Sequence, residues 1–129
     1  MLRLNKIHHI ALICSDYKKS KAFYTELLGF TILKETYRTE RDSYKLDLAL
    51  NGTYTLELFS FPDPPPRVSG PEAAGLRHLA FETDDLEMAV ATLREKGVRT
   101  EDIRTDGITG KRFVFFRDPD DLPLELYEN

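Results

Sequence analysis

The sequence predicts an α+β fold made of two βαβββ units whose sheets curl into a cup. The first observation is a short pattern, histidine-aliphatic-alanine-hydrophobic, that begins at His9 and again at His78. The second is a Leu-Glu-Leu-aromatic pattern centred on Glu57 and again on Glu125. The two histidines are 69 positions apart and the two glutamates 68. A nearly constant offset across half the chain indicates a duplicated structural unit.

The first unit, residues 1–61, shows the periodicities of one helix and four strands. Ser15 or Asp16 is a suitable N-cap, and Gly29 is a suitable residue to follow the helix. Asn51-Gly52 is a strong signal for a two-residue hairpin. The expected order is a strand at 7–14, a helix at 17–28, and strands at 30–37, 44–50 and 53–61.

Residues 62–75 hold five of the seven prolines and are expected to connect the two units. The second unit, residues 76–129, repeats the order of the first, with Asp84 or Asp85 as N-cap and Gly97 after the helix. Its expected elements are a strand at 76–83, a helix at 86–96, and strands at 98–103, 112–117 and 122–127. We expect the 129 residues to form a single domain of two such units.

Strand parity predicts which side chains share a face, because successive side chains of a strand point to opposite sides of the sheet. In both units the leucines beside the glutamate face the helix. The histidines and glutamates therefore lie on the helix-free faces: His9, Glu57, His78 and Glu125. If the two sheets curl toward each other, these four side chains meet inside the cup.

Two imidazoles and two carboxylates are suitable ligands for one divalent first-row metal ion. Taken alone, Glu57 or Glu125 is an ordinary solvent-facing strand residue, and His8 is a rival to His9. The duplication favours the metal site, since Arg77 occupies the position that corresponds to His8. Such mixed nitrogen and oxygen ligands suit nickel, cobalt, manganese, iron or zinc, and affinity alone does not choose among these metals. Nickel and zinc are our first expectations.

Bulk properties exclude several other classes of function. The net charge is −4, with 18 basic and 22 acidic residues, so we expect neither nucleic acid nor an anionic membrane as a partner. No apolar run approaches the ~20 residues of a membrane span, and residues 1–6 contain no signal-peptide core. The single cysteine, Cys14, excludes an intrachain disulfide and fits the cytoplasm, where we interpret it as a small buried strand residue.

Two further groups of residues allow two interpretations each. Arg38 and Arg41 belong either to a solvated turn or to the rim of the cup, where they would bind an anionic group of a substrate. Several apolar residues are either core between the sheets or walls of a substrate pocket: Ile13, Phe59, Phe61 and Tyr127.

Together these motifs resemble the vicinal oxygen chelate superfamily, which includes glyoxalases, bleomycin resistance proteins and dioxygenases. The similarity covers the whole chain and is closest to small bacterial proteins related to glyoxalase I. The similarity rests on seven stretches of sequence: residues 9–12, residues 22–24 with Asp16 and Ser20, residues 27–30, residues 56–58, residues 78–81 with Asp85, residues 118–120, and residues 124–126. The resemblance implies paired βαβββ units that hold one divalent metal ion.

Metal-dependent glyoxalase I has four ligands in the order His or Gln, Glu, His, Glu, and this chain matches that order. The resemblance therefore implies a lyase that converts an α-ketoaldehyde–thiol hemithioacetal through an enediolate, the lactoylglutathione lyase reaction. It implies Glu125, with Glu57 as the alternative, as the catalytic base. It also implies a homodimer and a small-molecule substrate.

The chain departs from glutathione-dependent members at two positions. Ile13 and Phe61 stand where those enzymes usually carry Arg and Asn, and neither apolar side chain can bind the polar groups of glutathione. The resemblance therefore does not specify the thiol. Two alternatives stay open: another metal-dependent enzyme, such as an epimerase or an antibiotic-modifying thiol transferase, and a module that binds an aromatic drug without catalysis.

Overall fold

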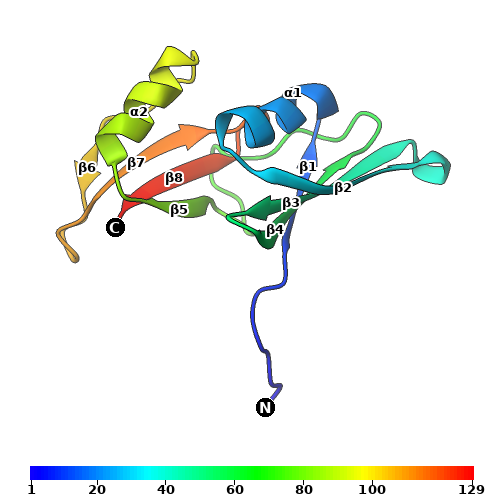
Figure 1. Cartoon of the computed structure of the whole chain (residues 1–129), viewed down its shortest axis with the longest axis horizontal. Coiled ribbons are helices and arrows are strands. Elements are labelled where there is room, and N and C mark those ends of the chain that lie inside the picture. The colour runs from blue at the N-terminus through cyan, green and yellow to red at the C-terminus, as the bar shows by residue number, and fades with distance from the viewer. The chain divides into compact units, whose positions relative to one another are not determined.

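The computed structural model describes all 129 residues as two compact units, Met1–Pro65 and Pro66–Asn129. Each unit contains one four-stranded mixed sheet and a helix, so the predicted α+β class is confirmed (Figure 1). No helix is both long enough and apolar enough to span a membrane.

Unit 1 is a four-stranded sheet in the order β1-β4-β3-β2. β1 and β4 run parallel, and the other neighbouring pairs are antiparallel. Its elements are β1 (Ile10–Cys14), α1 (Tyr17–Ala22), the π-helical turn η1 (Phe23–Leu27), β2 (Thr31–Arg38), the 3-10 turn η2 (Thr39–Arg41), β3 (Ser43–Leu50) and β4 (Thr53–Ser60).

Local chemistry sets the ends of these elements. The Asp16 carboxylate accepts a hydrogen bond from the Lys19 backbone N–H at 3.1 Å and caps α1. Asn51 and Gly52 both have positive φ, 49° and 81°, as a type I′ hairpin turn between β3 and β4 requires. The core of unit 1 includes five side chains that are at most 1% exposed: Tyr24, Leu46, Leu48, Leu56 and Leu58.

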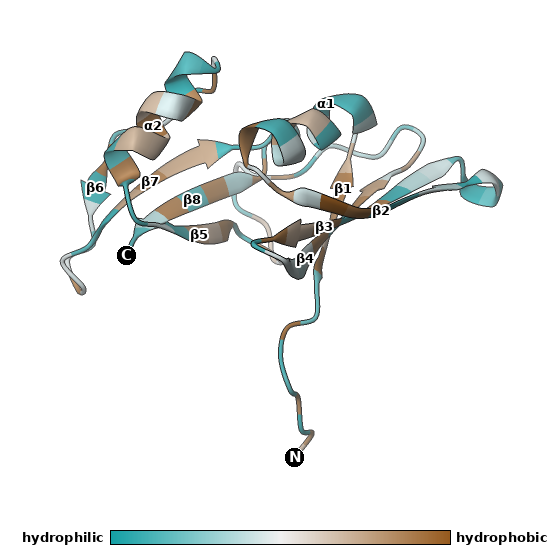
Figure 2. Cartoon of the chain, viewed as in Figure 1, coloured by the Kyte–Doolittle hydropathy of each residue, from teal (hydrophilic) through white to brown (hydrophobic).

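Unit 2 repeats this topology with the order β5-β8-β7-β6. Its core includes Leu86, Val90 and Val114, with Ile103 and Leu126 packed against them. In Figure 2, β7 of unit 2 and the arrowhead end of β3 of unit 1 are in the hydrophobic colours. The elements are β5 (Leu79–Thr83), α2 (Leu86–Glu95), β6 (Arg104–Thr105), β7 (Arg112–Arg117) and β8 (Pro123–Glu128).

The strand predicted at residues 98–103 is wrong. The Val98 N–H is already taken by the Leu93 carbonyl at the end of α2, and Thr100 makes only an isolated bridge with Phe116. A regular ladder begins only at Arg104, and β6 is two residues long. The apolar Ile103 packs on the core as its hydrophobicity suggested, but without a strand around it.

The first strand of each unit also begins later than expected. β1 starts at Ile10 and β5 at Leu79, whereas residues 7 and 76 were the expected starts. His9 and His78 therefore each stand one residue before a strand. The two histidines therefore occupy equivalent positions in their units, immediately before the first strand.

Candidate metal centre

In unit 1 the histidine and the glutamate of the predicted site lie side by side. The Nε2 atom of His9 is 3.7 Å from Oε1 of Glu57. Parallel pairing of β1 with β4 sets this proximity, since Ala11 is in register with Glu57. Leu56 and Leu58, on either side of Glu57, are each 1% exposed, so the glutamate is on the opposite face of the strand, as parity predicts.

Unit 2 builds the same pair. The Nε2 atom of His78 is 3.4 Å from Oε1 of Glu125, and Ala80 of β5 is in register with Glu125 of β8. The Glu57 and Glu125 side chains are 12% and 13% exposed. The duplicated sequence pattern thus corresponds to a duplicated arrangement of side-chain atoms, and each unit brings together one histidine and one glutamate.

Each pair has a spacing that suits two ligands of one ion. Ligand atoms about 2.0–2.2 Å from a shared metal ion lie roughly 3.0–3.5 Å from each other, close to the 3.7 and 3.4 Å observed. No cluster of three or more histidine, cysteine, aspartate or glutamate side chains is positioned to hold a metal ion. Each unit by itself therefore brings together two candidate ligands, fewer than the three or four protein ligands of a zinc site.

Glu57 is held by a polar network. Its Oε2 atom accepts a hydrogen bond from the Tyr54 hydroxyl at 2.9 Å and lies 3.4 Å from Lys45 Nζ. The Tyr54 hydroxyl is also 2.9 Å from Asp47, and its ring stacks on His9 with the ring centres 5.3 Å apart. Burial, followed by the hydrogen bonds with Asp47 and Glu57, raises the pKa of Tyr54, so this phenol stays protonated and donates.

Glu125 has a different environment. Its cross-strand partner on β7 is Phe115, where Glu57 has Asp47 on β3. Two residues earlier on the same face, β7 of unit 2 has Phe113, which is opposite Tyr127. The corresponding residue on β3 of unit 1 is Lys45, which is opposite Phe59. Around Glu125, aromatic rings thus stand where Glu57 has charged neighbours. The His78 ring packs edge-on against Phe115, with the ring centres 5.1 Å apart.

The second ring nitrogen of each histidine also has a neighbour. Nδ1 of His78 lies 2.9 Å from Nη1 of Arg77, and a guanidinium only donates, so this nitrogen accepts. The hydrogen of a neutral His78 ring is then on Nε2, which faces Glu125. In unit 1 the neighbour is His8, whose Nδ1 is 2.8 Å from Nδ1 of His9.

The cysteine, the apolar residues and the arginines that the sequence singled out differ in how exposed they are and in what they contact. Cys14 is buried, as interpreted. Ile13 is 59% exposed, whereas Phe59 and Phe61 stack on each other with Arg38 above both rings. Arg41 is in η2.

Three polar residues of the unit 1 site were missed by the sequence reasoning: Lys45, Asp47 and Tyr54. Lys45 and Asp47 are two positions apart in a predicted strand, which places both on one face. That spacing was a usable signal, but only the register of β3 against β4 shows that this face is the one with Glu57.

A model of the Glyoxalase/Bleomycin resistance protein/Dioxygenase superfamily matches residues 6–126, and the chain belongs to this superfamily. The uncharacterized protein YwkD of Bacillus subtilis is 70% identical over 97% of the chain and 98% of that protein. The uncharacterized protein YaeR of Escherichia coli is 62% identical over 99% of both. The crystal structure of a glyoxalase family protein from Enterococcus faecalis superposes with a TM-score of 0.89 at 50% identity, covering 95% of this chain and 97% of that one.

More distant relatives include two enzymes of known activity. Mitochondrial methylmalonyl-CoA epimerase from Bos taurus is 27% identical over 91% of this chain and 69% of that protein. Lactoylglutathione lyase from Schizosaccharomyces pombe is 27% identical over 94% of this chain and 46% of that protein.

Proposed function

We propose that this protein is a metal-dependent enzyme that moves a proton at a carbon beside a carbonyl group. The proposed reaction is the lactoylglutathione lyase type, in which an α-ketoaldehyde–thiol hemithioacetal becomes a 2-hydroxy thioester. The observation that carries the proposal is the duplicated His–Glu pair, with 3.7 and 3.4 Å between imidazole nitrogen and carboxylate oxygen.

His9, Glu57, His78 and Glu125 are the proposed ligands of one divalent ion, nickel or zinc before cobalt, manganese or iron. Each unit supplies two of the four. Such an ion supplies positive charge that stabilises negative charge developing on substrate oxygens. Because a histidine holds a metal ion through an unprotonated nitrogen, a His78 that held the ion through Nε2 would carry its hydrogen on Nδ1, and Arg77 would have to turn away from that atom.

Glu125 is the proposed base, and the surroundings of the two glutamates support this assignment. Glu57 is anchored by the Tyr54 hydroxyl and the Lys45 ammonium, whereas Glu125 lies beside the His78 imidazole and forms no ion pair with a lysine or arginine. The less constrained carboxylate is better able to take a proton from one carbon and return it to the adjacent one. The overall change is an isomerisation, so it consumes no oxidant or reductant. A positioned general base typically contributes ~10²–10⁴-fold to the rate.

A methylmalonyl-CoA epimerase-like reaction is a second candidate, supported by the relative that catalyses it. Both reactions begin with removal of a proton beside a carbonyl, and they differ in where the proton returns. A lyase of the glyoxalase I type returns it to the neighbouring carbon, whereas an epimerase returns it to the opposite face of the same carbon. The apolar side chains of Ile13 and Phe61 favour a thiol other than glutathione if the first reaction is the correct one.

The test combines metal analysis with turnover. The full chain, purified without a metal-affinity tag, is expected to hold about one divalent ion per chain and to convert methylglyoxal adducts of a panel of thiols to thioesters. Glu125→Gln should abolish turnover and largely retain the metal, whereas Glu95→Gln, on the exposed surface of α2, should behave as wild type. Proton exchange of a 2-methyl acyl-CoA without thioester formation would favour the epimerase. Normal turnover by Glu125→Gln would show that another residue is the base.

We further propose a homodimer, and the two arrangements of its sites are separable by mixing variants. His9→Ala removes a ligand from unit 1, and His78→Ala removes one from unit 2. If each site combines unit 1 of one subunit with unit 2 of its partner, a mixed dimer of the two variants contains one intact site, and metal binding reappears. If each site is formed within one chain, every site of the mixed dimer lacks a ligand, and mixing restores nothing.

A further inference from the structure

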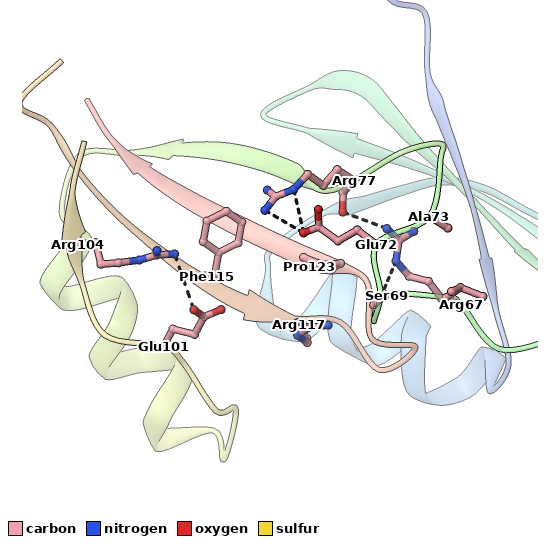
Figure 3. A pocket seen from close by; sticks show the side chains of 11 residues that line it. Arg67, Ser69, Glu72, Ala73, Arg77, Glu101, Arg104, Phe115, Arg117 and Pro123 are labelled. Atoms are coloured by element: carbon pink, nitrogen blue, oxygen red, sulfur yellow. Dashed lines mark hydrogen bonds and ion pairs between the residues drawn. The ribbon is translucent and has the colours of Figure 1, made fainter. Parts of the chain in front are cut away.

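Unit 2 contains a pocket of about 150 Å³ whose lining is rich in arginine. Figure 3 shows Arg67 and Arg104 on opposite sides of the Phe115 ring and Pro123, with Arg77 beside Glu72. The arginines come from the connector, the approach to β5, β6 and β7, so four separate parts of unit 2 contribute a guanidinium: Arg67, Arg77, Arg104 and Arg117.

Positive charge exceeds negative charge at this pocket. Four arginines line it against two glutamates, Glu72 and Glu101, although the whole chain has a net charge of −4. A third carboxylate, Asp121, lies outside the lining and pairs with Arg117 at 3.2 Å. Even with Asp121 counted, one guanidinium remains in excess.

Arg67 is the guanidinium without a carboxylate partner. It donates to the backbone carbonyls of Leu76 and Arg77 at 2.6 and 3.0 Å, and to the Ser69 hydroxyl at 3.0 Å. These neutral acceptors fix its position without neutralising its charge. A positioned guanidinium that keeps its charge attracts an anion and has little further ordering entropy to lose on binding it.

The other three arginines are held by ion pairs that an entering anion can replace. The Arg104–Glu101 contact is long, 3.8 Å, and both side chains are more than half exposed. Arg77–Glu72 is likewise exposed on both sides, at 3.1 Å. Exposed pairs of this kind contribute only ~0–1 kcal/mol, so exchanging the glutamate for a ligand carboxylate costs little.

The pocket borders the His78–Glu125 pair. Phe115 lines the pocket, is in register with Glu125, and packs against the His78 ring. Arg104 lies over the same Phe115 ring, 5.8 Å from its centre. An anion held by the arginines is therefore separated from the proposed metal ligands by the width of one aromatic ring.

We infer that this pocket binds the carboxylate or phosphate group of a small-molecule ligand. Drug-sized ligands occupy ~300–1,000 Å³, so a space of about 150 Å³ accommodates an anionic group and not a whole substrate. The pocket is thus a subsite, and the rest of the ligand extends along Phe115 toward His78 and Glu125. The identification of this ligand as the substrate rests on the proposed function, whereas anion binding by the arginines does not.

Calorimetric titration of the full chain at low ionic strength tests the inference. Malonate and inorganic phosphate are the anionic probes, and malonamide is a neutral probe of similar shape to malonate. We expect saturable binding of at least one anion and no binding of malonamide. The tighter of the two anions identifies the group that the subsite prefers.

Charge-matched variants locate the binding. Arg104→Gln and Arg117→Gln are each expected to weaken anion binding roughly tenfold, the effect of losing a charge-assisted hydrogen bond. Arg99→Gln removes the same charge from an exposed position outside the pocket and should change the affinity less than about twofold, consistent with screening of distant surface charges.

Three outcomes overturn the inference: no saturable anion binding, equal binding of malonamide, or an equal loss of affinity in Arg99→Gln. A fourth is loss of binding after treatment with EDTA, because the anion would then sit on a metal ion and not on the arginines. Metal content and turnover are measured separately, in the test of the proposed function. Retained anion binding in a chain that holds no metal and turns over no hemithioacetal would refute the proposed function alone.

Discussion

Lys45 reaches Glu57, with 3.4 Å between Nζ and Oε2, and no such cation accompanies Glu125. In unit 2 the residue that corresponds to Lys45 is Phe113, which is in register with Tyr127. The two units therefore share a histidine and a glutamate in the same geometry but surround the glutamates differently. Because of this difference, substitutions at equivalent positions are expected to have unequal effects.

The Lys45 ammonium should oppose binding of a cation at Glu57. Two unit charges about 4 Å apart interact by ~4 kcal/mol at an effective dielectric of 20, and solvent screening reduces this at a half-exposed site. We expect Lys45→Met to tighten zinc binding roughly tenfold in competition with a chromophoric chelator. Lys18→Met, on the exposed surface of α1, is the matched control and should leave the affinity unchanged. Unchanged or weaker zinc binding in Lys45→Met would contradict the proposed role of Glu57 as a ligand.

The Tyr54 hydroxyl links Asp47 and Glu57, with 2.9 Å to each carboxylate. Tyr54→Phe keeps the ring that stacks on His9 and removes only the donor. Hydrogen bonds to charged groups contribute ~1.5–3 kcal/mol, so we expect a loss of that order in the free energy of unfolding, measured with urea on the metal-free chain. A loss below about 0.5 kcal/mol would mean that water replaces the hydroxyl and that the network is not structural.

Acid stability should depend on Asp106. Hydrogen bonds from the Ile108 backbone N–H and the Tyr127 hydroxyl hold the pKa of Asp106 below its ordinary value of 3.8. A carboxyl whose pKa is lowered by folding stabilises the protein above the unfolded-state pKa, and this contribution is lost as the pH falls through the folded-state value. Asp106→Asn should therefore reduce the urea midpoint at pH 7, and the difference from wild type should shrink as the pH falls below about 4.

The control for this pH dependence is Asp102→Asn, at an exposed position of the same unit. Its urea midpoint should track that of the wild type at every pH. A difference between Asp106→Asn and the wild type that persists unchanged at pH 3 would show that the side chain acts through shape and not through its charge.

Leu124 should be a sensitive position of the unit 2 core. It is fully buried, next to Glu125 on β8, whereas Leu76 is 47% exposed. Large-to-small substitution in a core costs ~2–5 kcal/mol, so Leu124→Ala should lower the thermal midpoint markedly and Leu76→Ala should have little effect. Equal effects of the two substitutions would mean that β8 does not pack as described.

The sequence by itself determined the features that depend on local pattern. Hydrophobic period and caps located α1 and α2, with Asp16 and Asp85 as their N-caps. The duplication and strand parity placed the histidines and glutamates on the helix-free faces of their sheets, because period-two alternation and a constant offset are readable without coordinates. The exception at residues 98–103 arose because the end of α2 competes for the Val98 N–H.

Only the tertiary structure decided what surrounds the glutamates. Lys45 and Tyr54 approach Glu57 because of the register of β3 against β4, and no sequence spacing specifies which residues of two strands face each other. The arginine pocket is a stronger case, since Arg67, Arg104 and Arg117 are far apart in the chain and meet only through the folding of unit 2. A side chain's position on its own element is a local property that the sequence encodes directly. Its neighbours on other elements depend on packing and register, and these are settled only when the whole unit folds.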